Sequence, residues 1–209
     1  SSNTTTLASL TLENFTVQNG RASGNPTASG GGMLVDKANF SIRNVIFQNN
    51  KSIGGNSSVN SGGTSSGGGL TISDMPTNAT GTLENLTFIN NEARGGSYTG
   101  TGSNRGGLAL GGGFYMWRGN ITASNLTLIN NLAQGGHTTT GTGRDSSWMV
   151  AEAAGGGFSI HEGAAEISRL LVSENSAIGG NSITYAGGGY GGGIELEYDS
   201  YLLISDSSI

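Results

Sequence analysis

The chain has 209 residues, of which 34% are hydrophobic and 11% are charged, and its formal net charge is −5. Glycine fills 39 positions, and because each glycine disfavours a helix by roughly 1 kcal/mol relative to alanine, an ordinary helical protein is excluded. The excess of acidic over basic residues argues against nucleic acid as a partner. The absence of cysteine excludes disulfides and thiolate metal sites. No apolar run is long enough to span a membrane.

Two short motifs alternate along the chain. The first is an apolar alternation that ends in asparagine, at residues 12–19, 44–50, 85–91, 125–131 and, with a charged variation, 169–175. The second is a glycine triplet followed by alternating apolar residues, of which the first are Met33, Leu70, Phe114, Phe158 and Ile194. The segment from a triplet to the next asparagine motif is nearly constant in length, whereas the connection back to the next triplet varies.

A constant strand-bearing segment with one variable loop per repeat is typical of a solenoid. We expect about five coils of three short strands each, as at residues 33–35, 40–42 and 45–47, stacked in parallel about 4.8 Å apart. Parallel crossovers strongly prefer the right hand. The sequence therefore predicts an all-β protein, a right-handed parallel β-helix in which residues 1–209 form a single domain.

In such a coil, equivalent residues of successive repeats stack on one another and form the interior. The first apolar residues of the triplet strands form one internal column, and residues 47, 88, 128 and 172 form another. At a turn, a polar ladder is predicted, in which each side-chain amide bonds the next: Asn50, Asn91, Asn131 and Asn175. The glycine triplets suit tight corners with positive φ.

These motifs resemble the repeat region of chlamydial-type polymorphic outer membrane proteins, which carries FxxN and GGA-[ILV] tetrapeptides on a β-helix. Residues 47–50 and 88–91 fit FxxN, residues 128–131 and 172–175 keep only the asparagine, and the triplets have glycine where the family has alanine. The resemblance implies a surface-exposed adhesin.

Outward side chains of the triplet strands supply the candidate contact with a partner or glycan. Tyr115, Trp117, His161 and Glu197 are predicted to line one outer face, with Trp148 in the neighbouring loop. Aromatic faces stack on sugars and anchor interfaces. The alternative is that loop 137–154 folds over Trp117 and covers it.

The longer connections, residues 56–66, 97–110, 137–154 and 181–190, are expected to emerge on one edge of the coil. Loops on a rigid scaffold commonly hold binding residues, although their glycine, serine and threonine content is equally typical of mobile excursions. Both interpretations stay open.

An enzyme would need neighbouring carboxylates, and Glu195, Glu197 and Asp199 share one face if the strand alternates through them. A solvated acidic strand explains them better. His137 and His161 have no metal-ligand spacing, so neither a metal site nor a cofactor is predicted.

Glycosylation sequons are abundant. We expect Asn14, Asn85 and Asn125 to be buried in the coil, which leaves Asn56, Asn78 and Asn120 as candidate N-glycosylation sites. The functional prediction is an extracellular or cell-surface structural or adhesive solenoid without catalysis. It is either a slice of a longer solenoid or the subunit of an end-to-end filament, and its partner is itself or a surface glycan or protein. The alternative is a polysaccharide-active or glycan-binding β-helix.

Overall fold

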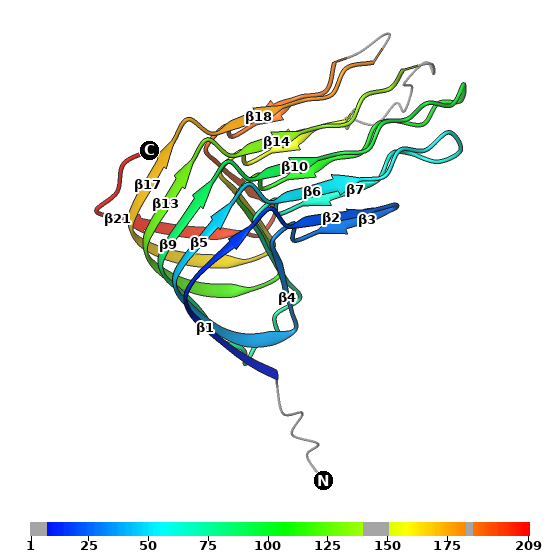
Figure 1. Cartoon of the computed structure of the whole chain (residues 1–209). Coiled ribbons are helices and arrows are strands. Elements are labelled where there is room, and N and C mark those ends of the chain that lie inside the picture. The colour runs from blue at the N-terminus through cyan, green and yellow to red at the C-terminus, as the bar shows by residue number, and fades with distance from the viewer. Residues whose placement is uncertain (1–7, 140–150, 183–185) are drawn as a thin grey trace.

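The computed structural model describes residues 8–139, 151–182 and 186–209, in which all regular structure is β-strand. Four parallel sheets, here called A to D, stack strands from successive turns (Figure 1). Within these ranges, no helix is long and apolar enough to cross a membrane.

The strands of the four sheets follow one another in the order A, B, C, D in every turn. Sheet A contains β1 (Ala8–Gln18), β5 (Ala38–Gln48), β9 (Gly81–Ile89), β13 (Asn120–Ile129), β17 (Ala164–Ser173) and β21 (Tyr201–Ser205). Sheet B contains β2 (Arg21–Gly24), β6 (Lys51–Gly54), β10 (Glu92–Arg94), β14 (Leu132–Gln134) and β18 (Ser176–Ile178). Sheet C contains β3 (Thr27–Ser29), β7 (Thr64–Ser66), β11 (Ala109–Leu110), β15 (Ala153–Ala154) and β19 (Gly189–Tyr190). Sheet D contains β4 (Met33–Asp36), β8 (Leu70–Ser73), β12 (Phe114–Trp117), β16 (Phe158–His161) and β20 (Ile194–Glu197).

The architecture is therefore a parallel β-solenoid, as predicted, but the prediction of three strands per coil is wrong. Residues 40–42 and 45–47 belong to one long strand, β5, rather than to two. Two further strands occupy the connection that was expected to be a loop. Each full turn thus passes through four sheets.

Asparagines in the left-handed region bend the strands of sheet A. Asn14, Asn44, Asn85 and Asn125 have φ between 52° and 62°, a conformation that asparagine adopts more easily than most residues. At such a bend the two-residue alternation is interrupted, so that Ile42 and Val45, three positions apart, are both fully buried. The expectation that Asn14, Asn85 and Asn125 are buried is consequently wrong, because their side chains are exposed.

The main core lies between sheets A and D. Both predicted columns are present: one joins the first residues of the sheet D strands, and the other runs through residues 17, 47, 88, 128 and 172 of sheet A. Phe47 stacks on Phe88 at 4.9 Å between ring centroids, and Phe114 on Phe158 at 4.7 Å. Burying a side chain of this size contributes about 1.5–3 kcal/mol, so the columns are a main source of stability.

The asparagine ladder lies at the turn from sheet A to sheet B. The Asn91 Oδ1 accepts hydrogen bonds from the backbone and side-chain nitrogens of Asn50, at 3.1 and 3.0 Å. Asn131 receives the same pair of bonds from Asn91, and Asn175 receives it from Asn131. Corners at the start of the triplets have the predicted positive φ, at Gly30, Gly67, Gly111, Gly155 and Gly191.

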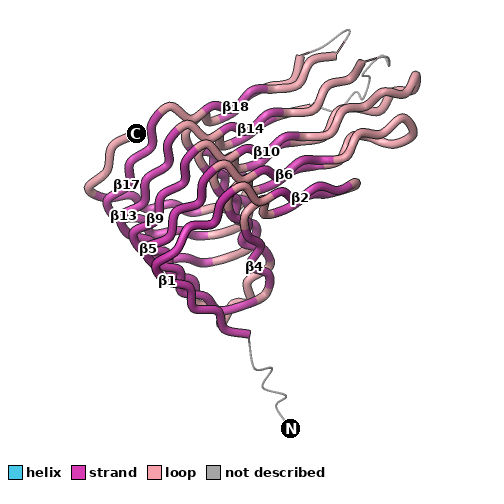
Figure 2. Tube along the Cα trace, in the orientation of Figure 1, coloured by secondary structure: helices cyan, strands magenta, loops and turns pink. Residues whose placement is uncertain are grey.

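Sheets B and C lie against each other and project from the coil as a thin plate, here called the fin (Figure 2). The interior of the fin is made of small side chains, including Ala93, Ala109, Ala133 and Ala153. Connections 56–66, 97–110 and 181–190, and the described ends of 137–154, thus belong to the fin, and each ends in a short strand of sheet C. Whether these connections hold binding residues or are mobile excursions stays open.

Candidate functional site

The outer face of sheet B carries the main cluster of cationic side chains. Alternation along each short strand places Ser52 and Ala93 inside the fin and the residues beside them outside. Arg21, Lys51 and Glu92 are in register on β2, β6 and β10, so their side chains follow one another along the stacking direction. Residues two positions further on, Arg94 among them, form a second outward column.

Glu92 is the anionic centre of this cluster. Its carboxylate lies 2.8 Å from the Lys51 Nζ and is also paired with the Arg94 guanidinium, while its side chain is only 11% exposed. Burial raises the pKa of Glu92, but the bond to Lys51 and the charges of Arg94 and Lys51 outweigh it and hold the pKa below its ordinary value. Glu92 is therefore ionised at neutral pH and fixes both cations.

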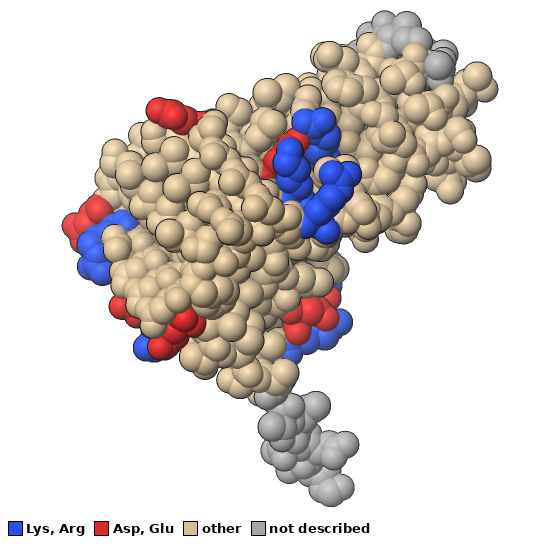
Figure 3. Space-filling model, viewed as in Figure 1, with Lys and Arg blue, Asp and Glu red and all other residues tan. Residues whose placement is uncertain are grey.

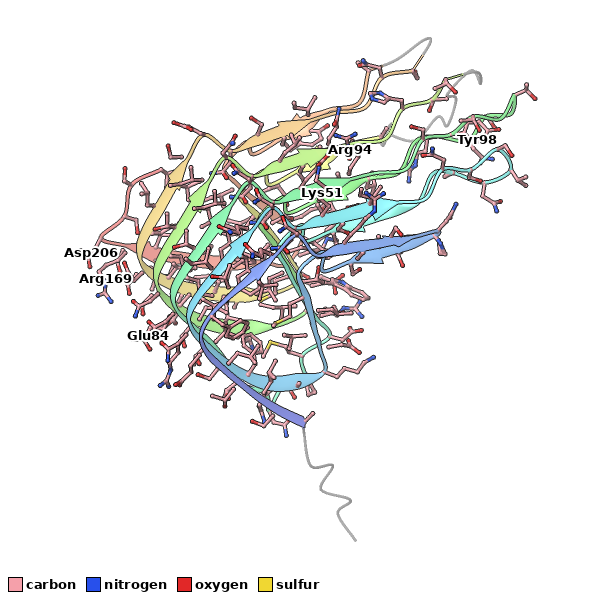
Figure 4. The ribbon with its side chains drawn as sticks, in the orientation of Figure 1. Lys51, Glu84, Arg94, Tyr98, Arg169 and Asp206 are labelled. Atoms are coloured by element: carbon pink, nitrogen blue, oxygen red, sulfur yellow. The ribbon has the colours of Figure 1, made fainter. Side chains whose placement is uncertain are left out.

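A groove of about 430 Å³ opens over these residues. It is lined by charged and neutral polar groups from four strands of sheet B and from the residues that follow them in the fin: Arg21, Lys51, Asn56, Glu92, Arg94, Ser97, Gln134 and His137. In Figure 3, blue side chains gather around a red patch near the junction of the fin with the coil. Figure 4 places Lys51 and Arg94 on the fin side, away from Glu84, Arg169 and Asp206.

The charge of the groove is not balanced internally. Three cationic side chains face one carboxylate, and within the described ranges Arg21 has no ion pair or side-chain hydrogen bond. The Gln134 side-chain amide likewise has no hydrogen-bond partner there. His137 accepts a hydrogen bond at Nδ1 from the Asn181 backbone N–H, which leaves its Nε2 as the protonated nitrogen of the neutral ring.

The predicted contact face on sheet D is only partly assembled. Trp117, His161 and Glu197 are in register on neighbouring strands, as the repeat spacing implies. Tyr115 lies in the adjacent outward column but is only 9% exposed, so its ring is not available as an open stacking platform. Trp148 lies outside the described residues, and so does most of loop 137–154, which was the alternative cover for Trp117.

Internal partners occupy the exposed side chains of this face. The Arg118 guanidinium lies 4.5 Å from the Trp117 ring centre, over its face. The His161 Nδ1 lies 3.1 Å from the Glu197 carboxylate, and the His161 ring packs on Tyr198 at 4.7 Å. A ligand would have to compete with these contacts.

Two groups on sheet D have pKa values above their ordinary range. Burial, followed by the charges of Glu197 and Glu195, raises the pKa of Tyr115, so the phenol stays protonated. Burial also raises the pKa of Glu195, although Ser159 donates a hydrogen bond to its carboxylate. The strand β20 ends at Glu197 and the next residue, Tyr198, has positive φ, so Asp199 does not continue the predicted acidic face.

The remaining predicted sites occupy the surface. Asn56, Asn78 and Asn120 are exposed, as a glycosylation site requires, and Asn56 accepts a hydrogen bond from the Ser97 backbone N–H. Among the described residues, no group of three His, Asp or Glu side chains could hold a metal ion.

The cationic groove was missed from sequence, although a signal for it exists. Lys51 and Glu92 directly follow the ladder residues Asn50 and Asn91, and Arg21 holds the equivalent position in the first repeat. Extending the repeat alignment by one residue would have placed Arg21, Lys51 and Glu92 in one column. No protein-family model, curated protein or solved structure matches this chain.

Proposed function

We propose that this protein is an extracellular or cell-surface adhesive solenoid, whose fin presents a ligand-binding groove and which binds without chemical turnover. The observation that carries the proposal is the groove over Arg21, Lys51 and Arg94, in which the Arg21 guanidinium and the Gln134 amide have no side-chain partner among the described residues. Backbone pairing across the whole stack supports it, because a fixed scaffold pre-organises such a surface and lowers the entropic cost of binding.

The asparagine and glycine-triplet motifs also support this proposal, but less directly. Their resemblance to chlamydial-type polymorphic outer membrane proteins is in keeping with an adhesive role and a cell-surface location. We also propose that the coil is right-handed with about five turns, because parallel crossovers favour that hand.

A polysaccharide-active enzyme is the second candidate, and the paired His161 and Glu197 beside Glu195 favour it. Glu195 has a raised pKa, as a general acid requires, and Glu197 lies on the same strand face two residues further on. Against it, the His161 contact occupies Glu197, and Ser159 donates to Glu195.

Binding and turnover can be separated in one experiment. Immobilised glycans and cell-surface extracts are incubated with the purified chain, and retention and the release of reducing sugar are both measured. The proposal predicts retention with no release. Release of reducing sugar that is lost in Glu197→Gln would show an enzyme instead. If the chain is not retained and releases no sugar, both candidates are contradicted.

A further inference from the structure

We infer that the groove on the outer face of sheet B recognises a linear acidic polysaccharide, one that carries carboxylate or sulfate groups, laid along the stacking axis. This inference rests on the proposed adhesive function and names its ligand class. It is carried by three cations that line the groove, two of which pair with its single carboxylate, together with neutral polar side chains along the same groove.

The spacing of the cations suits a repeating anion. Arg21, Lys51 and Arg94 come from three successive strands of sheet B, and strands in a sheet are about 4.8 Å apart. The cations are thus distributed over roughly 10 Å of the axis in single-strand steps. A chain with an anionic group on each sugar meets them in succession.

Glu92 holds Lys51 and Arg94 in place and offsets the repulsion between them. Lys51 and Arg94 are about half exposed despite their pairing with Glu92, so each can also contact a ligand. Arg21, which has no ion pair within the described ranges, contributes the charge that is not compensated. The groove therefore has a net attraction for anions.

The neutral lining favours a carbohydrate over other polyanions. Asn56, Ser97, Gln134 and His137 supply amide, hydroxyl and imidazole groups that suit sugar hydroxyls. Among the described lining residues, the His137 imidazole is the single aromatic ring, so the groove has no series of rings on which successive nucleic-acid bases could stack. It lies over a sheet face and not along a strand edge, so an acidic peptide would gain no backbone pairing there.

The test compares an oligogalacturonate and a sulfated dextran oligomer with neutral dextran of the same length, by calorimetric titration of the whole chain at low and high salt. We expect the acidic oligomers to bind and neutral dextran not to bind, with affinity that falls as salt rises. Arg21→Gln should weaken binding about tenfold, which corresponds to about 1.4 kcal/mol. Glu92→Gln, which removes the competing carboxylate, should strengthen binding about threefold, or about 0.7 kcal/mol.

Arg169→Asn is the matched control. It removes one positive charge from sheet A, on the other side of the molecule, and it places asparagine at a left-handed position in line with Asn125 (Figure 4). If Arg21→Gln and Arg169→Asn weaken the binding of acidic oligomers equally, binding depends on the overall charge of the protein and the inference is overturned. Equal binding of neutral dextran, or no binding of any acidic oligomer, would also overturn it.

The retention experiment on surface extracts distinguishes a failure of this inference from a failure of the adhesive function. If surface extracts retain Arg21→Gln as well as the parent, and retain the parent in high salt as well as in low salt, the adhesive function stands but the groove is not the adhesive site. Thermal unfolding of each variant shows whether a change in binding reflects a loss of folding. A Glu92→Gln variant that is folded and binds no more tightly than the parent also counts against the groove.

Discussion

At the residue scale, asparagine serves three structural purposes in each of the middle repeats. Asn85 bends the long strand, Asn90 turns the chain toward sheet B, and Asn91 enters the buried ladder. The first two have positive φ and exposed side chains, whereas Asn91 is 1% exposed. These three asparagines lie within six positions of one another and have the same side chain. Their different structural roles are thus set by backbone conformation.

The sequence predicts the ladder but not the bend, and the difference has a physical cause. Ladder positions recur at a fixed distance from Phe47 and Phe88, so repeat alignment is enough to place them. The bend at Asn44 depends on one residue in the left-handed region, which shifts the inward and outward alternation. Counting by twos through that residue assigns Asn14, Asn85 and Asn125 to the wrong face.

Substituting a central member of the ladder should destabilise the protein. In Asn91→Ala, the two nitrogens of Asn50 lose their acceptor, and the Phe47 carbonyl loses a donor. Each buried polar group left unpaired costs about 1–3 kcal/mol, so we expect a loss of about 3 kcal/mol in the free energy of unfolding. Urea denaturation measures it.

The neighbouring residue provides the control for this substitution. Asn90→Gly keeps the exposed, left-handed position, to which glycine is suited, and should change the unfolding free energy by less than about 1 kcal/mol. A similar midpoint for Asn91→Ala and the parent would show that the ladder contributes little to stability.

At the element scale, the fin is held together by backbone rather than by side chains. The Gly63 N–H donates to the Gly55 carbonyl within one turn, and the Gly96 N–H donates to the Gly63 carbonyl from the next. The series continues through Gly107 and Gly136, at 2.7–2.9 Å. Sheets B and C approach so closely here that these positions must lack a side chain.

This arrangement explains why the sequence predicts loops where the fin lies. Its sheet C strands are two or three residues long, and their inward residues are alanine or serine, so no hydrophobic alternation marks them. Backbone hydrogen bonds between glycines leave no side-chain pattern in the sequence. The long strands of sheet A, with Ile42 and Phe47 inside, carry the signal that the fin lacks.

A single methyl group in the glycine series should loosen the fin locally. In Gly107→Ala, the new Cβ would collide with the Gly63 carbonyl and separate the two sheets. Overpacking of this kind costs typically about 1–3 kcal/mol. We expect hydrogen exchange to accelerate at the amides of Gly96 and Gly136 while amides in sheet A, such as that of Phe88, keep their protection.

Ala109→Ser tests whether any added atom has this effect. Its aligned neighbour in sheet C is Ser65, which is buried and donates a hydrogen bond to the Ser52 carbonyl. A serine at position 109 therefore has a precedent one turn away and should leave exchange nearly unchanged. If Gly107→Ala also leaves the Gly96 amide protected, close approach of the sheets is not what requires glycine.

At the scale of the whole molecule, the stack is uneven by one strand. Sheet A has six strands and sheets B, C and D have five each in the described part of the chain. A second copy that added β1 onto β21 would leave one strand position empty in each of the other three sheets. Between two copies of these described strands, end-to-end pairing in all four sheets, which stays a prediction, therefore requires β21 to leave its position.

Removing residues 201–209 should make the two ends match. The β1 of a second copy could then pair with β17, with Leu10 and Leu12 in the columns that Leu202 and Ile204 occupy, while all other sheets continue. We expect the shortened chain to form fibres in negative-stain microscopy and to sediment with increasing concentration, because every open strand edge finds a partner. The same deletion with Leu12→Lys, which places a charge in the new core contact, should remain dispersed. Fibres from the full chain, or none from the shortened one, would contradict this account of how the ends fit.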